Sequence, residues 1–183
     1  MTRQNIVNSG LSAEPEIGRW LWAFEDTRAR TREELDLLTP PVIDWRPPHG
    51  ESSIGTVLYH MALIEADWLY AEVLEQEDYA PEAMALFPHA HRDSAGQLTQ
   101  VYGVSLDEHL GRLAAVRRLV LDVFKPMSLA EFRRVRHLPS YDVTPEWVLH
   151  HLMQHEAEHR SQLGTLRMAA ERDLGLPGSP PSN

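Results

Sequence analysis

Residues 144–174 read TPEWVLHHLMQHEAEHRSQLGTLRMAAERDL and predict one long amphipathic helix. Thr144 is a favourable N-cap, Pro145 suits the first helical position, and Gly175 provides a stop signal. A helix advances by about 100° per residue, which gathers the apolar residues on one face. This apolar stripe is formed by Val148, Leu152, Leu163 and Leu166. The helix is therefore expected to pack this face against the rest of the protein.

Two histidines interrupt the apolar stripe. His155 and His159 are four residues apart, so they lie one turn from each other on the same face. Both are expected to point into the interior, where an imidazole without partners costs about 1–3 kcal/mol. One metal ion bound by both rings would satisfy them. Hydrogen bonds to buried carboxylates, hydroxyls or water are the alternative.

Three further stretches show helical periodicity, and none alternates convincingly as a strand does. They span residues 13–38, 53–76 and 105–124. Ser52 or Ser53 suits the N-cap of the second of these helices, and Ser105 that of the third. Together with the fourth stretch they predict an all-α protein, a four-helix bundle with long connections after its second and third helices. The predicted organisation is a flexible N-terminus at 1–12, a single domain at 13–174 and a disordered tail at 175–183.

The connections are predicted to be largely irregular. Residues 39–50 are rich in proline and predict a loop. Residues 77–104 leave room for a short helix near 81–86, and a connection of this length usually crosses an end of a bundle or lines a site. Residues 125–143 are expected to form a helical turn at 128–132, followed by an extended piece.

A metal site needs more than the two histidines of one helix, and the second helix offers a third. His60 lies among Val57, Met61 and Ile64, at the border of the buried face. A lone histidine in such a place is more often a core residue with a hydrogen-bond partner than a ligand. Combined with His155 and His159, it would complete an all-histidine site inside the bundle.

The remaining candidates are weaker. Asp67 lies two turns beyond His60 on the same face and is a candidate fourth ligand or proton acceptor. His151 could lie at the rim of the site, whereas Glu156 and Glu158 are interpreted as surface residues or as groups that orient a histidine. His89 and His91 form a His-x-His pair that could chelate metal if the loop is extended, but they are interpreted as solvated loop residues. The other histidines are not expected to bind metal, because His150 points away from this face and His49, His109 and His137 have no ligand-spaced partner.

Composition excludes several classes of function. The chain has 183 residues, a formal net charge of -10 and no cysteine. The missing cysteines exclude disulfides, thiolate-bound metals and a cysteine nucleophile. The negative charge argues against nucleic acid or a membrane surface as a partner. With no apolar run long enough to span a bilayer and no signal-peptide pattern at the N-terminus, a cytoplasmic location is expected.

Two segments of the chain resemble the DinB/YfiT-like metalloenzyme family. They read SSIGTVLYHMALIEADWL at 52–69 and LHHLMQHEAEHRSQLGTLR at 149–167, the latter with the string HRSQL from His159 onward. The resemblance implies a four-helix bundle that binds a divalent metal through His60, His155 and His159. Zn²⁺ or Ni²⁺ is expected, although neutral imidazoles also suit iron and copper.

The resemblance also bears on function. Relatives of this bundle include enzymes that use mycothiol or bacillithiol, among them S-transferases and a maleylpyruvate isomerase. This implies a metal-dependent transferase or hydrolase that activates a small-molecule thiol or water, acts on a small-molecule substrate and forms a homodimer. Because the chain lacks cysteine, such a thiol would be a low-molecular-weight cofactor. The alternative is a non-catalytic, stress-related bundle with a structural or ligand-binding metal site.

Overall fold

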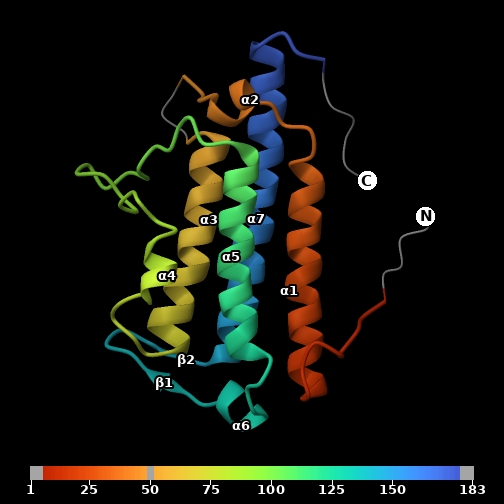
Figure 1. Cartoon of the computed structure of the whole chain (residues 1–183), viewed down its shortest axis with the longest axis vertical. Coiled ribbons are helices and arrows are strands. Elements are labelled where there is room, and N and C mark those ends of the chain that lie inside the picture. Colours follow the sequence, from red (N-terminus) through yellow and green to blue (C-terminus); the bar gives the residue numbers. More distant parts are fainter. Residues whose placement is uncertain (1–5, 49–51, 178–183) are drawn as a thin grey trace.

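The computed structural model describes residues 6–48 and 52–177. Four long helices form a bundle (Figure 1): α1 (Pro15–Glu34), α3 (Ile54–Trp68), α5 (Leu106–Phe124) and α7 (Pro145–Asp173). Helix α7 packs against both α1 and α3, and α5 packs against α3. The predicted all-α four-helix bundle is confirmed. Within the described residues, no helix is both long and apolar enough to cross a membrane.

The direction of the helices explains the length of one connection. In Figure 1 the chain ascends through α1, descends through α3, descends again through α5 and ascends through α7. Because α3 and α5 run in the same direction, the chain must return along the full height of the bundle between them. Residues between the end of α3 and the start of α5 make this return, with the short helix α4 (Pro81–Met84) near its beginning. We call residues 75–105 the crossover.

Helix boundaries follow the predicted caps. The side chains of Ser53 and Thr144 each accept a hydrogen bond from the first turn of the helix that follows. Ser105 and Glu108 form a reciprocal capping box at the start of α5. Gly175 adopts a left-handed φ of 66° after α7, a conformation that glycine reaches without steric cost. These local signals set the ends of the helices.

Several smaller elements differ from the prediction. The proline-rich loop contains the helix α2 (Pro40–Asp44), whose Val42 and Ile43 are buried. The first helix ends before Leu37, which has a positive φ of 61°. The last turn of the second helix is the π-helix η1 (Leu69–Val73).

The connection between α5 and α7 also contains regular structure. The predicted turn is the helix α6 (Leu129–Phe132), and it is followed by two short strands. These are β1 (Arg136–His137) and β2 (Asp142–Val143), which pair in antiparallel orientation. They are too short to show a period in the sequence. The hairpin lies at the lower end of the bundle in Figure 1.

The chain ends lie partly outside the described residues. Residues 1–5 and most of the predicted tail, 178–183, are outside them. Within the described part, the Ser12 hydroxyl donates to the Lys125 carbonyl, and Leu11 packs against the core. At the other end, the Leu176 amide donates to the Glu171 carbonyl.

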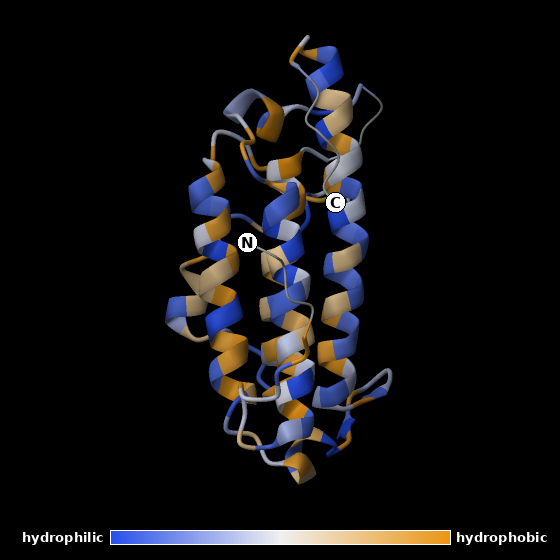
Figure 2. Ribbon diagram, turned by 90° about the vertical axis from the view of Figure 1, so that its right-hand side faces the viewer, coloured by the Kyte–Doolittle hydropathy of each residue, from blue (hydrophilic) through white to orange (hydrophobic). Residues whose placement is uncertain are grey.

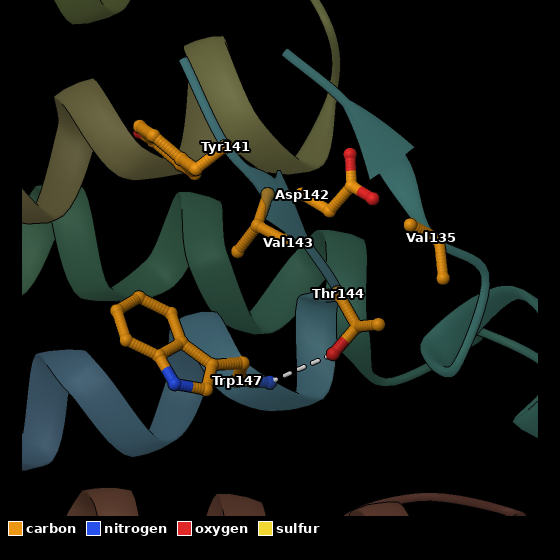
Figure 3. Close-up of a pocket in the computed structure, with 6 residues that line it drawn as sticks. All are labelled: Val135, Tyr141, Asp142, Val143, Thr144 and Trp147. Carbon is orange, nitrogen blue, oxygen red and sulfur yellow. Dashed lines mark hydrogen bonds between the residues drawn. The ribbon is translucent and has the colours of Figure 1, made fainter.

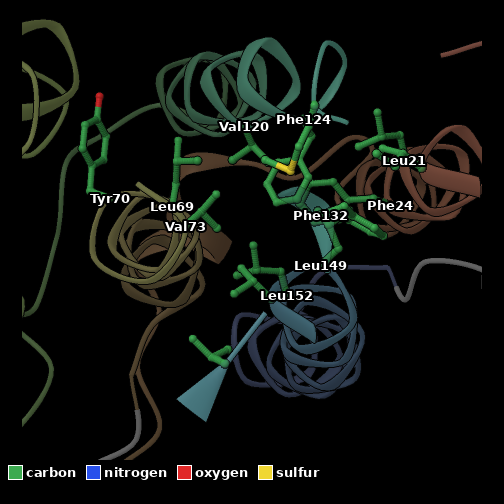
Figure 4. Packing of buried hydrophobic residues seen from close by; sticks show 14 of the residues in the cluster. Leu21, Phe24, Leu69, Tyr70, Val73, Val120, Phe124, Phe132, Leu149 and Leu152 are labelled. Carbon is green, nitrogen blue, oxygen red and sulfur yellow. The ribbon is translucent and has the colours of Figure 1, made fainter. Parts of the chain in front are cut away.

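The hydrophobic core has two parts. Hydrophobic and hydrophilic residues alternate along each long helix (Figure 2), as expected when one face is buried. The lower core (Figure 4) consists of Ile17, Leu21, Phe24, Leu69, Tyr70, Val73, Ala83, Val120, Phe124, Met127, Phe132, Val143, Val148, Leu149 and Leu152. The upper core consists of Leu35, Leu38, Val42, Ile43, Ile54, Val57, Leu58, Met61, Ala62, Ala66, Leu113, Val116, Leu163, Leu166 and Ala170.

Candidate metal centre

Polar side chains lie between the upper and lower cores. On α7, the lower core ends at Leu152 and the upper core begins at Leu163. Both His155 and His159 fall in this interval, and His60 faces them from α3. The two histidines that interrupt the apolar stripe in the sequence therefore lie in a polar layer between the two cores of the bundle.

The three histidines converge through the same ring atom. The Nε2 atom of His155 lies 3.2 Å from Nε2 of His60 and 3.1 Å from Nε2 of His159. All three side chains are partly buried. Among the described residues, they form the one group of three or more potential ligand side chains whose donor atoms lie within 4.8 Å of one another.

This donor set fits a divalent transition metal. Two nitrogens that bind one tetrahedral ion at about 2.0–2.1 Å are expected to lie about 3.3–3.4 Å apart. The observed separations of 3.1 and 3.2 Å are close to that value. Imidazole is a ligand that zinc, nickel, iron and copper accept. Small adjustments of the rings would therefore complete three bonds to a single ion.

The environment keeps two of these imidazoles neutral. Burial, with the neighbouring histidines acting in the same direction, lowers the pKa of His60 to about 3. Burial also lowers the pKa of His155 to about 4, with His159 contributing in the same direction. A metal binds the neutral ring through its lone pair. At neutral pH these rings are thus in the protonation state that metal binding requires.

A hydrogen bond fixes the orientation of His159. Its Nδ1 atom lies 2.8 Å from the side-chain oxygen of Gln162, one turn further along α7. An amide oxygen only accepts hydrogen bonds, so Nδ1 carries the proton and the lone pair resides on Nε2. Gln162, from the HRSQL string, therefore orients Nε2 of His159 toward the other two histidines.

His91 also contacts the site. Its Nε2 atom lies 3.0 Å from Nδ1 of His60, and its side chain is partly buried. The expectation that His91 is a solvated loop residue is wrong, because the crossover brings it against α3. Its neighbour in the His-x-His pair, His89, is exposed as expected. The sequence signal for His91 is the pair itself, but nothing in the sequence indicates which member approaches the bundle.

Asp67 and His151 lie beside the three-histidine group and are not part of it. Asp67 is exposed and accepts a hydrogen bond from the Tyr79 hydroxyl at 3.2 Å. The ring of His151 lies 6.1 Å from that of His155 and is parallel to Trp147, with an interplanar angle of 4°. Trp68 packs against His151 at 4.2 Å between ring centroids. His151 therefore belongs to an aromatic row at the edge of the site.

A pocket lies at the far end of this aromatic row. Its volume is about 490 Å³. It is lined by Val135, Tyr141, Asp142, Val143, Thr144 and Trp147 (Figure 3). Trp147 is shared between the pocket and the row that leads to His155. The pocket lining and the histidines are thus connected through neighbouring aromatic side chains, Trp147 and His151.

The remaining histidines are separate from the three-histidine group. His150 contacts Trp20 on the opposite side of α7, and His137 is exposed beside Asp142. His109 is buried, and its Nε2 atom has no hydrogen-bond partner among the described residues. His49 lies outside the described residues.

Glu156 is not a surface residue. It is 3 % exposed and points into the bundle, whereas Glu158 is exposed. Glu156 forms ion pairs with Arg28 at 2.7 Å and with Arg117 at 2.8 Å. Glu65 of α3 binds the same two arginines, each at 2.7 Å. We call Arg28, Glu65, Arg117 and Glu156 the arginine–glutamate layer; it accounts for the buried charges beside the histidines.

Comparison with known proteins supports the same assignment. No curated protein matches the chain in sequence. The family model described as the DinB superfamily matches residues 23–163, a region that contains His60, His155 and His159. The match covers most of the chain and all four long helices in whole or in part. The chain therefore belongs to the DinB superfamily.

Proposed function

We propose that this protein is a metal-dependent enzyme that holds one divalent cation on His60, His155 and His159. The observation that carries the proposal is the convergence of three Nε2 atoms with separations of 3.1 and 3.2 Å. The lowered pKa values of His60 and His155 support it, because both rings are neutral when the cation must bind. Zn²⁺ and Ni²⁺ are the proposed ions, since both accept imidazole nitrogen.

The proposed chemistry is activation of a small-molecule thiol or of water, for group transfer or hydrolysis. A divalent cation with three protein ligands keeps an open position, where it lowers the pKa of a bound water or thiol. The three imidazoles contribute no negative charge, which leaves the full charge of the cation to act on that molecule. Because the chain has no cysteine, any thiol must come from a small molecule.

The surrounding side chains have distinct proposed roles. Gln162 keeps the Nε2 lone pair of His159 directed at the site. The aromatic row of His151, Trp68 and Trp147 provides an apolar wall next to His155. Such a wall suits the apolar part of a small substrate, with polar selection left to the few groups around it.

Metal content tests the binding step. The protein is purified without a histidine tag, and metal per chain is measured by elemental analysis. We expect about one ion per chain in the wild type, and a loss of bound metal in His155→Ala and His159→Ala. His150→Ala is the matched control, since it removes an imidazole from the same helix on the side facing Trp20. Equal, near-zero occupancy in the wild type and all variants contradicts the proposal.

Activity tests the catalytic step. The metal-loaded protein is incubated with a low-molecular-weight thiol and an electrophilic test substrate, and in a parallel series with an activated ester in water. We expect turnover by the wild type and the His150→Ala control, and its loss in His155→Ala. Full metal occupancy without turnover in either series instead supports a non-catalytic metal site.

A further inference from the structure

His60 differs from the other two histidines in having both ring nitrogens engaged by histidines. Its Nε2 atom faces Nε2 of His155 at 3.2 Å, and its Nδ1 atom faces Nε2 of His91 at 3.0 Å. A neutral imidazole carries one proton, so one nitrogen donates and the other accepts. For Nε2 to bind a cation, the proton of His60 must be on Nδ1. The Nε2 atom of His91 lies where it can accept a hydrogen bond from this Nδ1–H.

The relative orientation of the rings indicates a hydrogen bond. The planes of His60 and His91 are inclined by only 12°, and their centroids are 5.2 Å apart. The distance between the centroids is longer than the 3.0 Å between the nitrogens by about the width of one imidazole ring. This is the difference expected when each nitrogen lies on the line between the centroids, half a ring width from its own centroid. The two rings therefore meet edge to edge in nearly one plane, with the nitrogen–nitrogen vector along the line of centroids. That is the arrangement of a linear N–H···N hydrogen bond.

The crossover is attached to α3 at the adjacent position. The Tyr59 hydroxyl donates to the carbonyl of His89 at 2.7 Å and accepts from the amide of the same residue at 3.0 Å. Tyr59 precedes His60, and His89 precedes His91 by two residues. Beyond His91, its carbonyl accepts a hydrogen bond from the Thr99 amide. The backbone of the crossover is therefore held on both sides of His91, which keeps this residue beside His60.

We propose that His91 is a positioning residue that accepts the Nδ1–H of His60 and thereby fixes the tautomer in which Nε2 of His60 is free to bind the cation. This inference rests on the proposed metal site and extends it, because it makes the crossover a functional part of that site. Groups that accept the second N–H of a metal-bound histidine contribute about 10- to 100-fold to metal affinity. The same range is expected for His91.

The chain allows a matched set of variants. In His91→Gln, the side-chain oxygen lies as many bonds from the backbone as Nε2 of histidine, so the acceptor is retained. In His91→Asn, the oxygen is one bond too short to reach His60. His91→Ala removes the acceptor altogether. His89→Ala is the control, because the side chain of His89 is exposed and its hydrogen bonds with Tyr59 are made by the backbone; its ring makes only a tilted contact with Tyr59, at 5.8 Å between centroids.

Affinity for Zn²⁺ alone is measured by competition with a chromogenic chelator at fixed pH. We expect a loss of about 10- to 100-fold in His91→Ala and His91→Asn, and a substantial rescue in His91→Gln. His89→Ala is expected to match the wild type. Equal affinity in the wild type and His91→Ala overturns the inference while leaving the three-histidine site intact. An equal loss in His89→Ala also overturns it, because the effect then comes from the crossover as a whole.

A second readout does not require metal. Nitrogen-15 NMR of the metal-free protein reports which nitrogen of His60 carries the proton. We expect a protonated Nδ1 in the wild type and in His91→Gln, and a mixture of tautomers in His91→Ala. Protonation of Nε2 in the wild type overturns the inference. If the wild type takes up no metal, the proposed function fails, and this spectrum still decides whether His91 sets the tautomer.

Discussion

Glu65 and Glu156, on two different helices, bind the same two guanidinium groups. Arg28 donates to both carboxylates at 2.7 Å, and Arg117 donates to Glu65 at 2.7 Å and to Glu156 at 2.8 Å. All four side chains are nearly excluded from solvent. Burial alone would raise the pKa of Glu156, but Arg28 and Arg117 outweigh it and hold that pKa below its ordinary value. The two carboxylates and two guanidiniums therefore neutralise one another inside the core.

The first prediction concerns this arginine–glutamate layer. Removing one member leaves an uncompensated buried charge, which costs about 3–5 kcal/mol. Glu156→Gln is therefore expected to lower the free energy of unfolding by about that amount, measured by urea denaturation with chelator present. Glu158→Gln, an exposed neighbour on the same helix, should change it by less than about 0.5 kcal/mol. Equal effects of the two substitutions contradict the importance of the layer.

The second prediction concerns His109 and pH. Burial, with Arg112 acting in the same direction, lowers the pKa of His109 to about 4. Between about pH 6.5 and pH 4 the unfolded chain binds a proton that the folded protein does not, so stability falls as pH falls. The contribution lost by pH 5.5 is about 1 kcal/mol. His109→Gln should show a correspondingly weaker pH dependence in urea denaturation, and an unchanged dependence contradicts a neutral, buried His109.

The third prediction concerns metal removal. The upper and lower cores pack the four helices without the three histidines. Chelation should therefore leave the far-ultraviolet circular dichroism unchanged. Free Zn²⁺ at about 100 times its Kd should add about 2.7 kcal/mol to the free energy of unfolding, seen as a higher Tm. His155→Ala should not show this increase. Unfolding of the wild type by chelator alone would support a structural metal.

The fourth prediction concerns Gln162. Its side-chain oxygen accepts the Nδ1–H of His159, so Gln162→Ala should weaken Zn²⁺ binding by about tenfold or more. Gln162→Glu retains an acceptor oxygen and should bind more tightly than the alanine variant. Gln154→Ala, at an exposed position on α7, serves as the control. If Gln162→Ala binds Zn²⁺ with wild-type affinity, the hydrogen bond from His159 to Gln162 is not needed for metal binding.

The main helices and their histidines are predictable because their signals are local and periodic. Thr144 and Ser105 cap the helices as their sequence contexts predict. The apolar stripe of α7 is buried at Val148, Leu152, Leu163 and Leu166. Histidines inside such a stripe must face the interior, so the convergence of His155 and His159 follows from helical geometry.

Other features depend on contacts between distant segments. Glu156 flanks the apolar stripe of α7 in the sequence, and its burial is explained by Arg28 and Arg117, which approach it from other helices. A sequence signal exists in Arg28, which lies one turn after the buried Phe24 on the same face of α1. The approach of His91 has no periodic signal, since it depends on the path of an irregular segment. The helix α2 escapes sequence analysis because prolines suit a loop as well as the first turn of a helix, and the segment is too short to show a helical period.

Because α3 and α5 run in the same direction, two different kinds of segment lie beside the three histidines. Regular helices carry the three proposed ligands, while the crossover, about thirty residues long and helical only in α4, passes beside them and is tethered at Tyr59. Loops tolerate insertion and replacement far better than packed helices do. A bundle of this topology can therefore acquire a different substrate preference by exchanging crossover residues other than His91, while the helices that carry the three histidines stay unchanged.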